Sequence, residues 1–345
     1  MIKKIKVRIA DVAQQAGVSA ATVDRVIHSR PGVKPHTADH IMAVIERMEN
    51  GGPNITPVTR AHLNNLRFDI ILPIGTNAFF DILEEEIREY ANRPANIGLS
   101  IRVHRIKSFD PDALAETIER ISRQTDGISI VAIESPQVRE AVNRTVQKGI
   151  PVVTLVSDLS GSRRTGYVGL DNRAGGRTAG YLMGRFLTGH VGTVLMLAGS
   201  PRLRDHEERE MGFRRVLSER FDNLKIITFL EDRDDDETTY QQVKKILEQH
   251  PDLVGIYDIG AGTRGIARAL EEAGRGTDIV FIGHELTRYS REFLINGVMD
   301  AVIDQVPRKE ARMLIDMLER FANGENGEYD SEAAPISVFF RENLP

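Results

Sequence analysis

Cysteine is absent from the 345-residue chain, so disulfide bonds and thiolate metal sites are excluded. The nine histidines show no zinc-binding spacing, and no nucleophile motif of the Ser-His-Asp kind is recognisable. No stretch of about 18 apolar residues occurs, which argues against a membrane-spanning helix. The first ten residues hold four basic side chains but no apolar segment long enough for a secretory signal. We therefore expect a cytoplasmic protein without a metal ion, a cofactor or a membrane anchor.

Charge is distributed unevenly along the chain, although the net charge is only −5. Residues 1–67 contain 10 Lys and Arg against 5 Asp and Glu, a net charge of +5, whereas the remainder has a net charge of −10. A basic segment on an acidic body favours a polyanionic partner for that segment alone. Chance variation of a solvated surface is the alternative that charge by itself leaves open.

Three short helices are predicted near the N-terminus, because apolar residues recur there at helical spacing. They span 9–16, 20–28 and 37–49. Ser19 is placed to cap the second helix, and Thr37 to cap the third. We assign these helices to a head domain, residues 1–50. The segment 51–66 begins with two glycines and contains two prolines, so it is predicted to be a linker.

Beyond the linker, short apolar runs alternate with amphipathic helical segments. This alternation predicts the α/β class, with doubly wound parallel sheets covered by helices on both faces. Nine apolar runs are many for one such sheet, so two lobes with a cleft at the carboxyl ends of their strands fit better. We assign lobe 1 to 67–169 and 306–330, and lobe 2 to 170–305 and 331–345.

The segment 9–27 has the spacing of a helix-turn-helix. Ala13 is small where two helices would cross, Gly17 suits the tight turn, and Val23 would anchor the second helix on the first. Residues 19–25 would then lie on the outer face, able to enter a DNA major groove. An ordinary small helical bundle is the alternative interpretation of this spacing.

The same segment resembles the lactose/galactose-repressor family. The resemblance rests on Asp-Val-Ala at 11–13, Ala-Gly-Val-Ser at 16–19, and Thr-Val and Arg-Val within 22–26, and it extends over 8–49. It implies a helix-turn-helix transcriptional regulator, most simply a repressor. Such a protein binds double-stranded operator DNA as a homodimer, because one recognition helix gives too little specificity.

The resemblance also implies which residues contact DNA, with the hydroxyl groups on phosphates. Those positions are Ser19, Ala20, Ala21, Thr22, Arg25, Thr37 and Leu63. Ala20 and Ala21 offer only methyl contacts, so base recognition would depend on Arg25. Asp24 stands where the family usually has Ser, and phosphate would repel it unless it accepts from a cytosine amine or pairs with Arg25. Leu63 would enter the minor groove, with packing on the core as the alternative.

Residues 68–340 resemble the periplasmic-binding-protein-like core of the same family, which is similar to ribose-binding proteins. The motifs that carry this resemblance include Asn-Ala-Phe-Phe at 77–80, 169–176 and 304–307. The resemblance implies a small effector between the lobes, with planar polar groups on its hydroxyls and aromatic faces on its ring. The positions expected to contact the effector are Phe79, Phe80, Asp158, Arg209, Asp258, Glu285 and Gln305.

Other interpretations exist for several of these positions. Phe79 and Phe80 could belong to the core, and Arg209 and Asp258 could be surface charges. The sequence also departs from the sugar-binder pattern after Asp258, where Ile-Gly replaces the usual Asn-Asp pair. The expected effector is therefore a sugar or polyol, while arginines near the predicted cleft would also allow a sugar acid or sugar phosphate. These arginines are Arg163, Arg202, Arg204 and Arg264.

Two alternative functions remain open at this point. Residues 260–265 match the pattern G-x-G-x-x-G after a predicted strand, with Glu285 twenty residues further on, which is the outline of an NAD-binding fingerprint. An NAD-dependent oxidoreductase is opposed by the late position of this motif and by the lack of an identifiable acid–base pair. Effector binding by backbone amides is a competing explanation of the glycines. A sugar-binding transport component is the other alternative, and the basic head opposes it.

Overall fold

The structure is a computed structural model in which the chain forms two compact units, 1–64 and 65–345. It describes residues 8–345 except 17, 29, 31–32, 34–36, 39–40, 43, 46–64, 75–76, 94–95, 97, 108–109, 199, 201, 231–235, 261 and 326–332. Within the described ranges, no helix combines the length and the apolar character needed to cross a bilayer.

The head contains α1 (Ile9–Ala16), α2 (Ala20–Ile27) and a third helical segment between 37 and 45. Ser19 caps α2 as predicted, because its side-chain oxygen accepts a hydrogen bond from the Thr22 N–H at 3.2 Å. Thr37, which we expected to cap the third helix, is itself helical. The buried core of the head consists of Val12, Ala13, Val23, Ile41, Val44 and Ile45.

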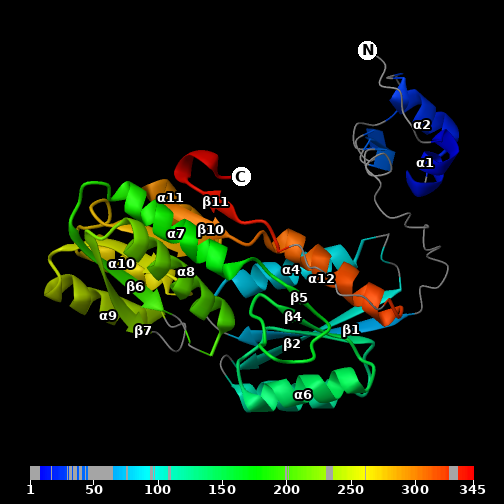
Figure 1. Cartoon of the computed structure of the whole chain (residues 1–345), viewed down its shortest axis with the longest axis horizontal. Helices are drawn as coiled ribbons and strands as arrows, with labels where there is room; N and C mark the ends of the chain where they lie inside the picture. Colours follow the sequence, from blue (N-terminus) through cyan, green and yellow to red (C-terminus); the bar gives the residue numbers. More distant parts are fainter. Residues whose placement is uncertain are drawn as a thin grey trace. The chain divides into compact units, whose positions relative to one another are not determined.

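Lobe 1, the part of the core built on the first sheet, has five parallel strands in the order β2-β1-β3-β4-β5. Helices α4 and α12 pack on one face of this sheet and α6 packs on the other (Figure 1), where α5 packs beside it. The strands are β1 (Leu66–Ile74), β2 (Leu99–Lys107), β3 (Gly127–Ile130), β4 (Val152–Leu155) and β5 (Gly166–Val168). The helices are α4 (Phe79–Ala91), α5 (Pro111–Ile121), α6 (Pro136–Gln147) and α12 (Pro307–Ala322).

Lobe 2 is built on the second sheet, whose order is β11-β10-β9-β8-β6-β7, with only β11 antiparallel to its neighbour. Helices α7 and α8 cover one face, and α9, α10 and α11 cover the other. The strands are β6 (Gly192–Ala198), β7 (Leu224–Leu230), β8 (Leu253–Asp258), β9 (Val280–His284), β10 (Ala301–Asp304) and β11 (Ser337–Phe339). The helices are α7 (Asn172–Phe186), α8 (Arg204–Arg220), α9 (Asp236–Gln249), α10 (Thr263–Glu272), α11 (Arg288–Asn296) and the 3-10 turn η2 (Arg341–Asn343).

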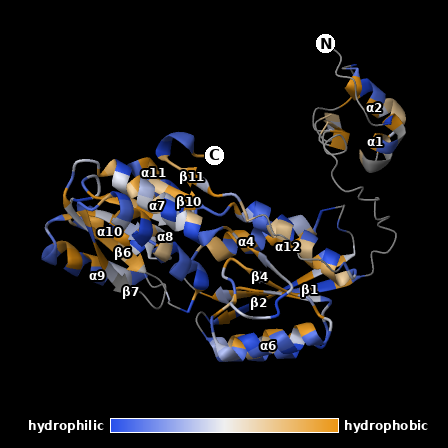
Figure 2. Ribbon diagram, viewed as in Figure 1, coloured by the Kyte–Doolittle hydropathy of each residue, from blue (hydrophilic) through white to orange (hydrophobic). Residues whose placement is uncertain are grey.

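The predicted α/β class with doubly wound parallel sheets is confirmed. Strands of both sheets are mainly hydrophobic in Figure 2, as expected of sheets covered on both faces. In each sheet the first strand in sequence, β1 or β6, lies between the second and the third. Ligands of such sheets bind beyond the carboxyl ends of the strands, at this switch in strand order.

The chain passes between the lobes at 169–171, 305–306 and 323–336. The first and third of these segments are joined by a parallel β-bridge between Leu170 and Ala334. The polar groups beyond the strand ends of both lobes are therefore held next to these connections.

Two glycines bring α7 and α8 into close contact. A Cβ atom on Gly176 would lie 2.0 Å from the backbone oxygen of Arg209, and one on Gly212 would lie 2.2 Å from that of Arg173. Side chains at either position would force the two helices apart. Because the helices approach so closely, the Arg209 side chain on α8 reaches Asn172 at the start of α7.

Candidate functional site

Helix α2 presents a polar, solvent-exposed surface in the head. Ala20, Ala21 and Arg25 are exposed, and the capping residue Ser19 is exposed beside them. The Ser19 and Thr22 hydroxyls share a hydrogen bond of 2.8 Å. This surface has hydroxyl donors, two methyl groups and one guanidinium, which are groups that contact phosphates and base edges.

Asp24 does not pair with Arg25, which was one of the two roles considered for it. Its carboxylate instead contacts His28 and Arg30, each at 3.0 Å. Among the described residues, no hydrogen bond or ion pair engages the Arg25 side chain, so this guanidinium is available to a partner. Leu63, the predicted minor-groove residue, lies outside the described residues.

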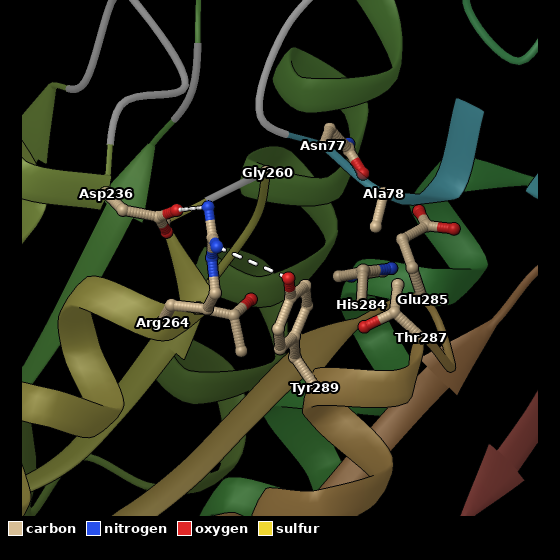
Figure 3. A pocket seen from close by; sticks show the side chains of 11 residues that line it. Asn77, Ala78, Asp236, Gly260, Arg264, His284, Glu285, Thr287 and Tyr289 are labelled. Carbon is tan, nitrogen blue, oxygen red and sulfur yellow. Dashed lines mark hydrogen bonds and ion pairs between the residues drawn. The ribbon is translucent and has the colours of Figure 1, made fainter. Parts of the chain in front are cut away.

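A pocket of about 370 Å³, including the part that is open to solvent, lies between the lobes (Figure 3). Residues that follow β1 line one side, and residues that follow β8 and β9 line the other. The lining residues are Asn77, Ala78, Asp236, Gly260, Gly262, Thr263, Arg264, His284, Glu285, Thr287 and Tyr289.

The Arg264 guanidinium at this pocket already has partners. It forms an ion pair with Asp236 and lies 4.7 Å from the centre of the Tyr289 ring (Figure 3). Both contacts satisfy the cation from within lobe 2. Arg264 is therefore poorly suited to act as the main counter-ion of a ligand phosphate.

Behind the pocket lies a buried polar cluster centred on Arg209, which is only 2% exposed. The guanidinium donates to Asn172 Oδ1 at 2.8 Å and to the Ile259 carbonyl at 3.0 Å, and it lies 3.5 Å from Glu285 Oε1. Gln305 Nε2 donates to the same Glu285 oxygen at 2.7 Å. Glu285 Oε2 and Gln305 Oε1 have no hydrogen-bond partner in the described part of the chain. A ligand hydroxyl, which can both donate and accept a hydrogen bond, would satisfy both atoms.

The environment of this cluster changes the protonation of its members. Burial raises the pKa of the Glu285 carboxyl to about 8, although Arg209 and Gln305 act in the opposite direction. Burial, together with the Arg209 cation, holds the pKa of His284 well below its usual range. The neutral His284 ring shares a hydrogen bond of 2.8 Å with the Tyr257 hydroxyl.

Comparison with known proteins assigns both units. Residues 8–49 match the family described as bacterial regulatory proteins, lacI family, and residues 68–326 match the periplasmic binding protein domain. The chain belongs to the lacI family. Its core is a periplasmic binding protein domain, so it is a helix-turn-helix DNA-binding regulator of transcription.

Individual relatives of this lacI-family protein cover most of its length. It is 23% identical to catabolite control protein A of Priestia megaterium over 98% of this chain and 99% of the relative. It is 24% identical to the ribose import binding protein RbsB of Escherichia coli (strain K12) over 74% of this chain and 85% of that one.

Solved structures share the fold of the core. A solute binding protein of an ABC transporter from Burkholderia graminis, in complex with D-arabinose, matches with a TM-score of 0.76 and 24% identity. That match covers 82% of this chain and 97% of the other. GanP, a glucose-galactose binding protein from Geobacillus stearothermophilus, matches with a TM-score of 0.73 and 20% identity over 81% and 99%.

Three of the seven expected effector contacts of this lacI-family regulator lie together. Arg209, Glu285 and Gln305 form the buried cluster, and Glu285 also lines the pocket. The alternative that Arg209 is a surface charge is wrong, because the residue is almost fully buried. All three side chains come from segments that follow strands of lobe 2 or from the first turns of α8.

The two phenylalanines do not line the pocket. Phe79 is 2% exposed and packs in the core of lobe 1 with Leu83 and Ile87, so its ring cannot stack on a ligand there. Phe80 is half-buried against the same core, and its ring centre lies 5.5 Å from that of Phe79 in an edge-to-face contact. The core alternative therefore describes these side chains better than stacking on a sugar does.

Two acidic residues are occupied by local partners. Asp158 forms an ion pair with Arg164 and accepts a hydrogen bond from the Thr154 hydroxyl at 2.7 Å. Asp258 is buried, and it accepts hydrogen bonds from the Gly260 N–H at 3.3 Å and the Thr263 hydroxyl at 2.8 Å. Both carboxylates thus stabilise loops next to strand ends, and neither lines the pocket.

The structure also shows polar residues that were not predicted to belong to a site. Asp171 caps α7, whereas Asn172, the first residue of that helix, accepts a hydrogen bond from Arg209 and orients its side chain. Asp205 on α8 and Glu310 on α12 are buried and have unpartnered oxygens within the described residues. A sequence signal exists for both, because each occupies the apolar stripe of its helix.

Proposed function

We propose that this protein is a homodimeric repressor whose affinity for operator DNA is controlled by a small polyhydroxy effector bound between the lobes. The observation that carries the proposal is the buried Arg209–Glu285–Gln305 cluster behind the pocket, with oxygen atoms that lack a partner. The D-arabinose complex and the ribose import protein among its relatives support a carbohydrate as the effector.

A neutral carbohydrate suits the site better than a sugar acid or phosphate. Arg264 pairs with Asp236 and Arg204 pairs with Glu208, while Arg163 and Arg202 are exposed. None of the four arginines that would have favoured an anion therefore provides a buried, unpaired cation at the pocket. Gln305 Oε1 is an acceptor, and the Glu285 carboxyl can donate or accept according to its protonation, so hydroxyl groups, which both donate and accept, can pair with both side chains.

The first strand of the core offers a route from effector to DNA. β1 begins at Leu66, directly after the linker, and leads at its other end to Asn77 and Ala78 in the pocket wall. Closure of the lobes on an effector would move the wall of lobe 1 and the linker attachment together. A coupling free energy of about 1–3 kcal/mol between the two binding events would suffice for regulation.

The glycine motif at 260–265 does not require a nucleotide. Gly262 is the N-cap residue before α10 and has a φ of 122°, a conformation suited to glycine. A Cβ on Gly265 would lie 2.2 Å from the Asp236 backbone oxygen. Glu285, which would bind a ribose in an oxidoreductase, is instead buried and bonded to Gln305. We therefore propose a regulator without catalytic activity, whose α10 amides face the effector.

A thermal-shift screen of the full chain would test the effector. The panel would contain neutral sugars, polyols, sugar acids, sugar phosphates and NAD(H), and each active compound would then be tested for its effect on operator binding. A neutral sugar or polyol at about 100 times its Kd should stabilise the core by about 2.7 kcal/mol and change operator affinity. Stabilisation by NAD(H) alone would contradict the proposal and favour a nucleotide-dependent function.

A further inference from the structure

His284, which lines the pocket, has a ring nitrogen that the protein leaves without a partner (Figure 3). This residue ends β9 and is 2% exposed. Its Nε2 shares a hydrogen bond of 2.8 Å with the Tyr257 hydroxyl, whereas Nδ1 has no hydrogen-bond partner within the described ranges. Because a buried nitrogen without a partner costs free energy, Nδ1 indicates a group that a ligand supplies.

The Tyr257 hydroxyl determines which nitrogen of this ring carries the proton. Burial raises the pKa of Tyr257, so the hydroxyl keeps its own proton and needs an acceptor. Among the residues that the structure describes, the acceptor within reach of this hydroxyl is His284 Nε2. Since burial and the Arg209 cation keep the pKa of His284 low and its ring neutral, the single ring proton lies on Nδ1. Nδ1 is therefore a hydrogen-bond donor.

Packing holds this donor in one orientation. The Tyr257 ring stacks on Phe213 with ring centres 4.4 Å apart, and the centre of the His284 ring lies 5.7 Å from that of Tyr257. A Cβ atom on Gly175 of α7 would lie 3.6 Å from His284 Cε1, so the start of α7 also packs against the ring. The position of Nδ1 is thus fixed before a ligand binds, which lowers the entropic cost of binding.

The backbone at Glu285 brings two consecutive side chains to one pocket. Consecutive side chains of a strand point to opposite faces of the sheet, but Glu285 directly follows β9 and has a left-handed φ of 69°. This change of direction lets His284 and Glu285 both line the pocket. The two residues offer an N–H donor and a carboxyl group, which suit two neighbouring hydroxyl groups of one ligand.

We propose that His284 is a specificity-determining residue, whose Nδ1–H donates a hydrogen bond to one hydroxyl oxygen of the effector while Glu285 binds a neighbouring hydroxyl. Tyr257 is a positioning residue, because it acts only through the location of the His284 proton. This inference rests on the proposed function, since it places both contacts on the same neutral carbohydrate. A sugar or polyol with two adjacent hydroxyl groups meets the requirement.

Isothermal titration of the full chain with neutral carbohydrates tests the contact. The probes are D-ribose, D-arabinose, D-glucose, D-galactose, D-sorbitol and myo-inositol. For each compound that binds, His284→Phe removes the donor and should raise the Kd about tenfold or more, because a ligand oxygen loses its partner. His284→Asn keeps an N–H near the position of Nδ1 and should bind within about threefold of the natural chain. His190→Phe, at an exposed position, is the matched control and should leave the Kd unchanged.

The location of the proton is tested without a ligand. Nitrogen-15 NMR of the full chain, labelled at histidine and measured at pH 7, distinguishes a proton on Nδ1 from one on Nε2, and the spectrum of His284→Asn identifies the His284 signals. The proton should lie on Nδ1 in the natural chain, and in Tyr257→Phe it should be shared between the two nitrogens, because Nε2 then lacks its donor.

A proton on Nε2 of the natural chain would overturn the inference, since Nδ1 could not donate. It would also be overturned if His284→Phe binds every active carbohydrate as tightly as the natural chain does. In that case, control of operator binding by the same carbohydrate would leave the proposed function intact. Absence of binding to every carbohydrate would contradict both.

Discussion

Replacement of Glu285 by Gln should remove a specific part of the pH dependence of stability. The pKa of the buried Glu285 carboxyl is about 8, against 4.5 for an ordinary glutamate. Because this pKa is raised in the folded state, protonated Glu285 stabilises the fold below pH 4.5, and that contribution is lost as the pH rises through about 8. Since a tenfold change in a protonation equilibrium corresponds to about 1.4 kcal/mol, ionising Glu285 in the folded core costs on the order of 5 kcal/mol.

Glutamine should fit the same site. Its carbonyl oxygen would accept from Gln305 and Arg209 as Glu285 Oε1 does, and its amide group would occupy the place of the unpartnered Oε2. The Glu285→Gln variant should therefore resemble the natural chain in stability near pH 5 and exceed it increasingly at higher pH.

Urea denaturation of the full chain between pH 5 and pH 9 measures this effect. The difference in the free energy of unfolding between variant and natural chain should grow by about 1.4 kcal/mol per pH unit and level off above pH 8. Glu116→Gln, at an exposed position, should follow the natural chain throughout. A difference that does not change with pH would refute the assignment of a raised pKa to Glu285.

The same geometry makes three further predictions. Arg25→Ala should weaken binding to an operator selected from random duplexes by about 1–3 kcal/mol without lowering the melting temperature, and unchanged affinity in fluorescence anisotropy would contradict its role. Gly176→Ala should destabilise the core by about 1–3 kcal/mol in urea denaturation, because its Cβ would lie 2.0 Å from the Arg209 backbone oxygen; a neutral effect would show that α7 and α8 separate freely. Arg209→Met should cost about 3–5 kcal/mol at pH 9, where Glu285 is ionised, and less at pH 6. An equal loss at both pH values would contradict the pairing of Arg209 with Glu285.

The architecture was predictable because its signals are local. β1 is buried from Phe68 to Leu72, so it had to be nearly continuous in apolar residues, and the amphipathic segments between strands had to pack on both faces of the sheets. The head was predictable for a similar reason, since Val12 and Val23 are its fully buried anchors on α1 and α2. Neither inference requires knowledge of contacts between distant parts of the chain.

We predicted an effector contact at Phe79 because the family resemblance implies one at that position. The helical periodicity of the sequence around Phe79 favours packing in the core instead. Phe79, Leu83, Ile87 and Ala91 recur at intervals of four and form the buried face of α4, so the sequence already contained the evidence for packing in the core. Asp158 has a comparable signal, because Arg164 follows six residues later and becomes its partner. A residue at a position where the family binds its ligand can therefore lose that contact when a neighbouring side chain in this sequence, such as Arg164 beside Asp158, becomes its partner.

The burial of Glu310 could be predicted from the sequence, but its surroundings could not. Glu310, Leu314 and Leu318 lie on one face of α12, so the sequence marks a carboxylate in an apolar stripe. On α8, Asp205 and Arg209 precede Phe213 and Leu217 at the same spacing. What the sequence does not show is that Glu310 lies within electrostatic range of Arg209, because the chain crosses between the lobes before α12 begins.

The cleft also concentrates backbone strain. Val156, Glu285 and Val306 have φ values between 57° and 69°, a left-handed conformation that side chains rarely adopt, and each follows a strand end or a connection between lobes. Such residues cost about 1–3 kcal/mol each. An effector that contacts Glu285 would bind one arrangement of the lobes more tightly than another and so favour that arrangement. That difference in affinity is the free energy through which an effector can change operator binding.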